Sequence, residues 1–266
     1  MALTYIEEVI SQFPDSADEL RQCKELYQKK LWHQLTDQLD LLILSSKCNI
    51  DFIRFEAKFI RDFRKYMNTL RYGSIVIQIA ARSFKHSIIN EVQGIAFCEQ
   101  ALNCIEEDEK KSQKEHFDDK KVDNTQTKLL IKTQVALFEL TRKVVADEDG
   151  GDDGKESGDG QFVNTPFKIA KAKLDEIESA MEMSIRACPP LIYSRYHYVC
   201  SKVWASQEEG NELPSDISWT AMFYKHAMSY LGYTALDEID DPQEWAHDIA
   251  LAALVAPNFY DFGELV

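Results

Sequence analysis

The chain has 266 residues, of which 45% are hydrophobic, and carries a formal net charge of −15. This length allows one large domain or two small ones, and the apolar share is ample for a core. The negative average field repels phosphate groups, so we expect neither nucleic acid nor an anionic membrane as a partner. Because the sequence holds no run of eighteen apolar residues and no basic segment at its start, we also expect no membrane-spanning helix and no secretory signal.

Helix-forming residues dominate the sequence, which contains only ten glycines and seven prolines. The first expected helix ends at Pro14. Its apolar residues are Leu3, Ile6, Ile10 and Phe13. Ser16 followed by Glu19 has the form of a capping box, which predicts the start of a second helix.

Residues 24–42 have the pattern of two short helices folded back on each other. Lys30 occupies the predicted turn, where a small residue is usual. After the turn, apolar residues recur at spacings of three and four: Trp32, Leu35, Leu39 and Leu42. Such a pair is typical of tetratricopeptide-like repeats, and we expect the ring of Trp32 to fill the angle between the two helices. An ordinary amphipathic hairpin of any all-α protein explains the periodicity equally well.

The next expected helix begins at Asp51, a capping residue, and has an unusually broad apolar face. The face combines two sets of residues, namely Ile53, Ala57, Ile60 and Met67 with Phe52, Phe55, Phe59 and Phe63. Its breadth predicts cover on two sides. Residues 70–81 include a β-branched run, but no partner strand is visible nearby, so we expect a helix there.

Residues 92–105 form another expected amphipathic helix, with its inward positions at Val92, Ile95, Leu102 and Ile105. The polar stretch 106–123 fits either a loop or a solvated extension of that helix, and Lys and Glu propensities favour the extension. Residues 127–145 return to a dense apolar pattern.

An acidic insertion at 147–162 interrupts the apolar pattern. Within it, residues 147–160 hold seven acids, one lysine and five of the ten glycines. This composition cannot bury enough apolar area to offset the entropy of ordering, which predicts disorder.

Clear helix signals return after the insertion, beginning with caps at Asn164 or Thr165 before Pro166. Later starts are expected at Pro189-Pro190, at Ser215 or Asp216, and at Asp241-Pro242, with Gly232 as a C-terminal cap and Pro257 as a stop. The last helix has five inward residues: Trp245, Ile249, Ala252, Ala253 and Ala256. The succession of pairs predicts an all-α fold, a right-handed solenoid of tetratricopeptide-like antiparallel helix pairs.

No pattern of residues indicates catalysis or metal binding, so we expect no catalytic, cofactor-binding or metal-binding residue and no cofactor. The acidic insertion fits no frame of an EF-hand, and Gly154-Lys155 lacks the hydroxyl of a phosphate-binding loop. The six histidines, at 33, 86, 116, 197, 226 and 247, fit packed or surface positions, and adjacent His247 and Asp248 are not expected to pair. The six cysteines, at 23, 48, 98, 104, 188 and 200, are expected to be reduced and mostly buried, as in intracellular proteins.

Four blocks of sequence resemble, in the same order, those of the non-ATPase regulatory subunit 13 family. Members of this family are PCI-domain subunits of the 26S proteasome lid. The four blocks are KELYQKKLWHQL at 24–35, KFIRDFRKYMNTL at 58–70, YKHAMSYLG at 224–232 and IALAALVAPNFYDFGELV at 249–266. In the second block the likeness lies in Phe59, Ile60, Phe63, Asn68 and Leu70. The polar stretch and the acidic insertion are not features of this family.

The resemblance implies that residues 1–266 are the N-terminal helical-repeat domain of a PCI-type subunit, without the C-terminal winged-helix part. It implies a non-catalytic scaffold of the regulatory-particle lid, which serves ubiquitin-dependent protein degradation in the cytoplasm and nucleus. The implied partners are other PCI-domain lid subunits, the MPN-domain deubiquitinase pair and a ubiquitin receptor. Two alternatives stay open: a PCI or tetratricopeptide scaffold of the signalosome or a translation initiation factor, and an enzyme using a groove lined by the aromatic residues at 52–63 and 193–198.

Overall fold

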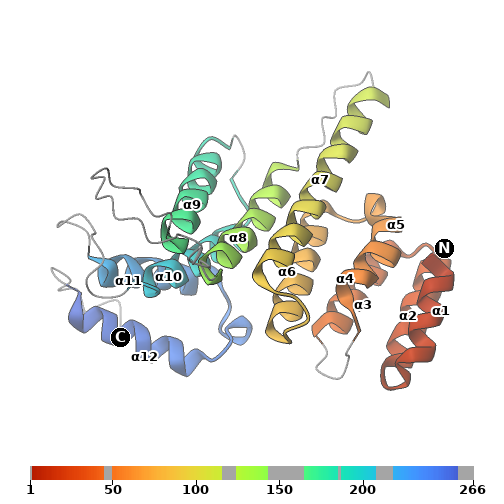
Figure 1. Cartoon of the computed structure of the whole chain (residues 1–266), viewed down its shortest axis with the longest axis horizontal. Coiled ribbons are helices and arrows are strands. Elements are labelled where there is room, and N and C mark those ends of the chain that lie inside the picture. Colours follow the sequence, from red (N-terminus) through yellow and green to blue (C-terminus); the bar gives the residue numbers. More distant parts are fainter. Residues whose placement is uncertain are drawn as a thin grey trace, which may run out of the picture. The chain divides into compact units, whose positions relative to one another are not determined.

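The computed structural model describes residues 2–44, 50–115, 124–142, 165–184, 187–207 and 218–256. Every regular element in these ranges is helical, and none of them contains a strand (Figure 1). The predicted all-α fold is therefore confirmed, including the helix at 70–81. Residues 116–123, Asn164 and the acidic insertion lie outside the described ranges.

The chain divides into two compact units, Met1–Val135 and Ala136–Val266. The first contains α1 (Ala2–Gln12), α2 (Ala17–Gln28), α3 (Trp32–Leu44), α4 (Phe52–Phe55), α5 (Arg61–Phe63), α6 (Thr69–Lys85), α7 (Glu91–Glu115) and the start of α8 (Thr125–Thr141). Successive helices pack on each other: α1 on α2, α2 on α3, α3 on α6 and α6 on α7. Layered packing of this kind lets each helix bury the apolar face of the one before it.

The turn between α2 and α3 confirms the predicted helix pair and shows how Lys30 replaces a small residue. Lys30 is in the left-handed region with φ 56°. Its N–H donates to the Tyr27 carbonyl oxygen at 3.0 Å, and the Leu31 N–H donates to that of Leu26 at 3.0 Å. This is the Schellman pattern of hydrogen bonds, in which glycine is the usual left-handed residue.

Trp32 lies at the junction of three helical segments rather than only in the angle between α2 and α3. Its ring meets Tyr27 edge-on, with 5.7 Å between centroids. It also stacks on Phe63 at 5.7 Å and on Tyr66 at 5.0 Å, with interplanar angles of 12° and 7°. The first two blocks of the sequence resemblance therefore pack against each other.

The segment from Phe52 to Tyr66 has one broad apolar face, as predicted, but it is not one regular helix. A π turn at Glu56–Ile60 separates α4 from α5, and a 3-10 turn, Arg64–Tyr66, follows. The predicted stripe is partly wrong, since Ala57 is exposed and Ile53 is only half-buried. The core side is occupied by the four larger rings, of Phe52, Phe55, Phe59 and Phe63.

The π turn also places a carboxylate in the core. Glu56 is fully buried; it accepts hydrogen bonds from Arg61 Nη2 at 2.7 Å and from the Tyr72 hydroxyl at 2.9 Å. A π turn holds one residue more than an α turn, so it shifts the side chains that face the core. Both partners are needed here because a buried carboxylate without them would be strongly destabilising.

Caps mark most of the predicted helix starts. Asp51 accepts from the Arg54 N–H at 3.1 Å, Thr165 from Lys168 at 3.3 Å and Asp241 from Glu244 at 3.4 Å. Pro190 opens a helix as expected. The helix start predicted at Ser16 is confirmed, because Ser16 is the N-cap residue of α2. The capping box itself is wrong, since Ser16 also ends the 3-10 turn Pro14–Ser16 and its side chain makes no capping hydrogen bond.

Three further expectations about helix bounds and faces need correction. The helix expected from Ser215 or Asp216 begins at Trp219, capped by Ser218, whereas residues 215 and 216 lie outside the described ranges. Gly232 lies inside that helix and does not cap it. Val92 is 55% exposed, and the inward face of α7 is formed by Phe97, Cys98, Ala101 and Ile105. α7 also runs on to Glu115, which confirms the helical extension as far as it is described.

The second unit contains the end of α8, then α9 (Pro166–Glu182), α10 (Pro190–Ala205), α11 (Trp219–Tyr233) and α12 (Pro242–Val255). α10 packs on α9 and α11, and α11 packs on α12. One core cluster joins these helices, formed by Trp204, Phe223, Tyr224, Ala227, Tyr230, Ile239, Trp245, Ile249, Ala252 and Ala253. The inward residues predicted for the last helix are confirmed, since Ala256 is buried as well. The third and fourth blocks of the resemblance meet in this core.

A close approach between α6 and α8 gives a first prediction. A Cβ on Gly73 would lie 2.9 Å from Thr127 Cγ2. Overpacking costs about 1–3 kcal/mol, which exceeds the gain of about 1 kcal/mol in helix propensity. Gly73→Ala should therefore lower the free energy of unfolding measured in urea.

The matched control is Gly232→Ala. A Cβ there meets no atom within 4 Å inside α11. This change should raise stability by about 0.5–1 kcal/mol. An equal gain in both variants would contradict the packing argument.

The left-handed conformation of Lys30 gives a second prediction. A left-handed conformation costs a residue with a Cβ about 1–2 kcal/mol. Lys30→Gly should thus stabilise the chain by about 1 kcal/mol in the same measurement. Lys29→Gly is the control, since Lys29 is right-handed with φ −79° and should lose stability. Destabilisation by Lys30→Gly would show that the turn does not need the left-handed residue.

Candidate interaction site

The described residues offer little for catalysis or metal binding. Within the described ranges, no three His, Cys, Asp or Glu side chains gather where they could hold a metal ion. The described cysteines are thiols rather than disulfides. Burial raises the pKa of both Cys23 and Cys200 to about 12, so these thiols are poor nucleophiles at neutral pH. Cys98 and Cys188 are also buried, which confirms the expected mostly buried thiols for this part of the chain.

Two histidines meet inside the second unit, which the sequence did not indicate. His197 Nδ1 of α10 lies 3.0 Å from His226 Nδ1 of α11. His197 also stacks on Tyr233, with 5.9 Å between ring centroids and 4° between planes. One nitrogen must donate and the other accept, so the contact needs at least one neutral imidazole.

The surroundings of this pair favour the neutral form of both rings. Burial lowers the pKa of His226 to about 4, and the neighbouring charges of His197 and Lys225 add to the effect. Burial and Lys225 lower the pKa of His197 as well. Packed histidines, as predicted, describe this pair better than a metal site or an acid–base pair.

The remaining described histidines lie at the surface. His33 Nδ1 lies 3.1 Å from Asp37 Oδ2, and His86 is the C-cap of α6. His247 Nδ1 lies 3.3 Å from Asp248 Oδ1, so the expectation that these neighbours cannot pair was wrong. Both side chains are largely exposed and can turn toward each other, although their Cβ atoms point apart.

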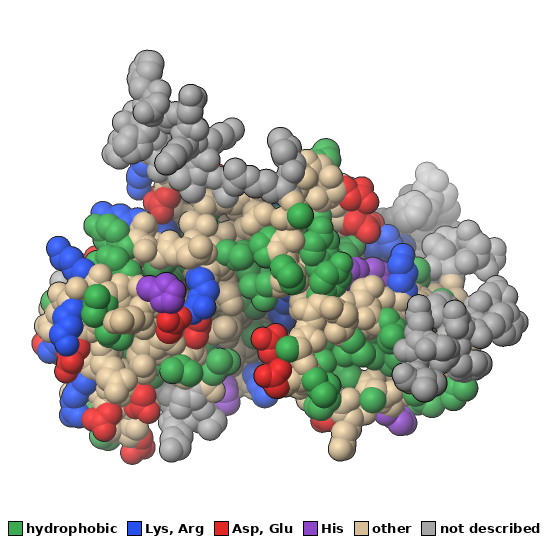
Figure 2. Space-filling view, turned by 180° about the vertical axis from the view of Figure 1, so that it is seen from behind, with side chains coloured by type: hydrophobic (Ala, Val, Ile, Leu, Met, Phe, Trp, Pro, Cys, Tyr) green, Lys and Arg blue, Asp and Glu red, His purple; other side chains and the backbone are tan. Residues whose placement is uncertain are grey.

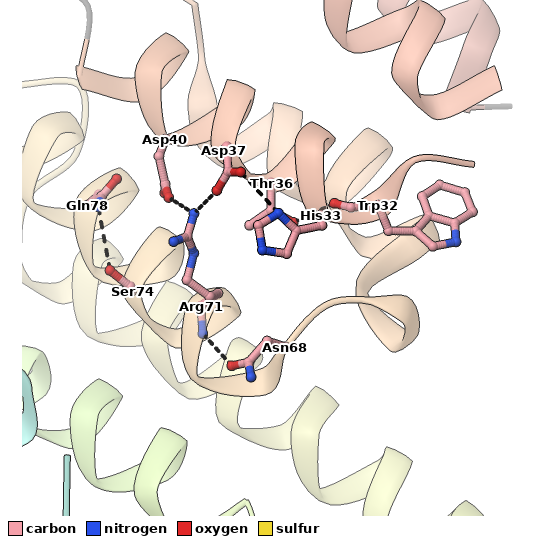
Figure 3. A network of polar contacts seen from close by, with 9 residues as sticks. All are labelled: Trp32, His33, Thr36, Asp37, Asp40, Asn68, Arg71, Ser74 and Gln78. Atoms are coloured by element: carbon pink, nitrogen blue, oxygen red, sulfur yellow. Dashed lines mark hydrogen bonds and ion pairs between the residues drawn. The ribbon is translucent and has the colours of Figure 1, made fainter. Parts of the chain in front are cut away.

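A polar network joins α3 to α6 in the first unit (Figure 3). Arg71 Nη2 lies 2.6 Å from Asp37 Oδ1 and 2.7 Å from Asp40 Oδ2. Asn68 Oδ1 caps α6 by accepting from the Leu70 and Arg71 N–H groups. Burial raises the pKa of Asp40, against the opposing influence of Arg71. This network fixes the orientation of two helices, and its half-exposed charges contribute little stability each.

An apolar groove lies in the second unit, with a volume of about 250 Å³. It is lined by Lys202 and Ala205 of α10, Trp219, Thr220 and Phe223 of α11, and Glu244, Trp245, Asp248, Leu251, Ala252 and Val255 of α12. The Lys202 ammonium lies 4.8 Å from the centroid of the Trp245 ring. The lining combines aromatic and aliphatic side chains with three charged ones, Lys202, Glu244 and Asp248, and suits the docking of apolar side chains.

Exposed apolar side chains occur elsewhere as well. Figure 2 shows hydrophobic side chains on one face of the molecule, interspersed with acidic and basic ones. Those exposed by more than half include Leu41, Leu44, Tyr66, Val92, Leu254 and Val255. Exposed apolar side chains that are neighbours on one helix, as Leu254 and Val255 are, mark candidate binding surfaces.

The comparisons with known proteins identify the family of the chain. A family profile described as PSD13 N-terminal repeats matches residues 19–150 and 156–266. The chain belongs to the PSD13 N-terminal repeat family. The resemblance noted in the sequence is thus confirmed.

Similar curated proteins carry the same family name. The chain is 27% identical over its whole length to 26S proteasome non-ATPase regulatory subunit 13 homologs A and B of Arabidopsis thaliana, covering 57% of each. It is 25% identical over 99% of its length to 26S proteasome non-ATPase regulatory subunit 13 of Dictyostelium discoideum, covering 56%. The chain thus spans a little over half the length of these relatives. No solved structure gives a significant match. None of the helices that the structure describes has the length and hydropathy needed to cross a bilayer.

The sequence did not predict three features that depend on packing between helices, namely the buried Glu56, the histidine pair and the groove. The sequence does give a signal for the buried Glu56, because this residue is an acid in the middle of an aromatic run. The groove and the histidine pair give no such signal in the sequence, because each combines residues from different helices that are separated by a connecting segment.

The histidine pair gives a third prediction, on pH dependence. A histidine that is neutral in the fold with a pKa of about 4 has a pKa of about 6.5 when unfolded. The unfolded chain then binds more protons between these values, so stability should fall as the pH drops from about 6.5 to 4, by up to about 3 kcal/mol. Urea unfolding at several pH values measures this slope.

His226→Gln should flatten the slope, because glutamine does not titrate. His33→Gln is the matched control, since the His33 side chain is 92% exposed and should leave the slope unchanged. If both variants kept the parental slope, the buried pair would not control stability in this range.

Proposed function

We propose that this chain is a non-catalytic scaffold component of the lid of the 26S proteasome regulatory particle. Its contribution to ubiquitin-dependent protein degradation would come through assembly of the lid. The observation that supports this most is the alignment of the whole chain with relatives named as 26S proteasome non-ATPase regulatory subunit 13. These names describe a regulatory subunit, and the proposal extends that role to this chain.

The geometry of the described residues supports a binding rather than a chemical role. The buried thiols and the packed histidine pair are unsuited to nucleophilic or acid–base chemistry at neutral pH. Successive helices bury each other's faces and form a packed framework, while apolar side chains such as Leu41 and Leu44 of α3 stay exposed. A rigid framework with exposed apolar patches suits the positioning of neighbouring proteins.

The partners we propose are other PCI-domain lid subunits, the MPN-domain deubiquitinase pair and a ubiquitin receptor, in the cytoplasm and nucleus. The charge of −15 disfavours nucleic acid and anionic membrane as alternatives.

The fourth prediction is the composition of the complex that the protein joins. The protein, tagged at its own chromosomal locus, should co-purify with proteasome lid subunits identified by mass spectrometry. Migration as a free monomer, or recovery of signalosome or initiation-factor subunits instead, would refute the proposal.

A pair of variants tests whether the folded helical framework is required. Leu35 of α3 is fully buried, whereas its neighbour Gln34 is exposed. Leu35→Asp places a charge in the core and should reduce the recovered lid subunits to background. Gln34→Asp introduces the same charge at the surface and should leave recovery unchanged. Normal recovery with Leu35→Asp would show that the helical framework does not carry the interaction.

A further inference from the structure

The aromatic core of the first unit reaches the surface at Tyr66. The ring of Trp32 stacks on the buried Phe63 and on Tyr66, with 5.7 Å and 5.0 Å between centroids. Tyr66 is 54% exposed, more than any other Phe, Tyr or Trp side chain that the structure describes. Leu31, which precedes Trp32, is 41% exposed. The outer end of the aromatic core is therefore open to solvent.

Lysine side chains lie beside these rings. Lys65 Nζ is 5.0 Å from the centroid of the Tyr66 ring, a distance typical of a cation–π contact. Lys30 is exposed in the turn that leads through Leu31 into Trp32. We call these five residues, from 30 to 32 and at 65 and 66, the aromatic–lysine surface. The stack of Trp32 on Tyr66 holds its two segments together.

The segments that carry this surface are basic in an acidic chain. Residues 24–35 and 58–70 hold seven Lys and Arg residues against two acids, whereas the whole chain has a net charge of −15. Lys30 and Lys65 make no ion pair with any described residue. Three of the other cations pair with carboxylates outside the two segments: Lys24 with Glu7, Arg61 with Glu56 and Arg64 with Asp108.

The acids around this surface are engaged elsewhere. Each has a partner of its own: Tyr27 for Asp62, Lys29 for Glu25, and Arg71 for both Asp37 and Asp40. Figure 3 shows the ring of Trp32 pointing away from the network around Arg71. Ammonium groups beside exposed apolar rings favour a ligand that is both acidic and apolar, because charge complementarity and apolar burial then act together.

We propose that the aromatic–lysine surface binds an acidic segment of another protein, with an aliphatic or aromatic side chain between its carboxylates. The apolar side chain covers Leu31 and Tyr66, and the carboxylates pair with Lys30 and Lys65. This arrangement is that of protein interfaces in general, in which aromatic residues are enriched at the buried centre and the rim is polar.

Two other occupants fit the charge of this surface less well. A nucleic acid carries a phosphate at every nucleotide and extends beyond these few residues into the field of a chain with net charge −15. A second copy brings the same net charge, which repels the first. A short acidic segment keeps its few charges near the lysines, and more distant charges are screened beyond about 10 Å at 0.1 M salt.

The test measures binding of defined peptides to the purified full chain by fluorescence anisotropy. The probe is the fluorescein-labelled peptide EEDLFDEE. It is compared with KKKLFKKK, which keeps the apolar pair, and with EEDAADEE, which keeps the acids. We expect EEDLFDEE to bind at least about tenfold more tightly than either, because each comparison removes one of the two contributions. The net charge of the chain favours KKKLFKKK, so preference for the acidic peptide reports on the local surface.

Two charge reversals locate the binding. Lys30→Glu combined with Lys65→Glu should weaken binding of EEDLFDEE at least about tenfold. Lys85→Glu combined with Lys132→Glu is the matched control, because these lysines are exposed on α6 and α8 and the change in net charge is the same. The control should alter the dissociation constant by less than about twofold, since distant charges are screened. Circular dichroism establishes that both variants keep their helices.

Absence of saturable binding of EEDLFDEE up to about 1 mM, or equal weakening in the two double variants, would overturn the proposal. Tighter binding of an oligonucleotide of eight thymidines, abolished by Lys30→Glu with Lys65→Glu, would assign the surface to nucleic acid instead. A dimer in sedimentation that the same variant loses would assign it to a second copy. Peptide binding does not require the proteasome, so its failure is distinguishable from failure of the co-purification.

Discussion

The burial of aromatic rings between successive helical layers is the interaction on which the rest of the structure depends. In the first unit, Tyr27, Trp32, Phe59 and Phe63 join α2, α3 and the irregular segment that follows. In the second, the rings of Tyr230 and Trp245 join α11 to α12, with 5.0 Å between centroids. Rings of this size bury much area with few rotatable bonds, which suits short helices that have little propensity to form alone.

The similarity to known proteins follows this pattern of contacts. The alignments to the relatives, at 25–27% identity, extend over 99–100% of the chain, and the described residues of the four blocks lie where helices pack on each other. Core packing constrains side-chain size and shape at those positions. Polar residues outside them are free to change as long as the helices form. The likeness therefore identifies the helical framework rather than the partner-binding surfaces.

Local signals in the sequence predicted the helical class and most helix starts, because periodicity and caps act within a few residues. Asp51, Thr165 and Asp241 cap as expected. Ser16 begins α2 as expected but makes no side-chain cap, since a capping motif does not reveal the 3-10 turn that precedes it. The π turn, the buried Glu56 and the histidine pair were missed because each depends on which residues approach from other helices. The groove was missed for the same reason, since residues of three helices form it.

The π turn at Glu56–Ile60 has a consequence for how the chain tolerates insertions and deletions. Each residue in an α-helix rotates the next side chain by about 100°. Loss of a single residue here would restore regular α geometry and rotate Phe63 and the stack on Trp32 away from Phe52 and Phe55. The length of this segment is therefore as strictly constrained as its aromatic content, even though Ala57 and Lys58 are exposed and make no demand on residue type.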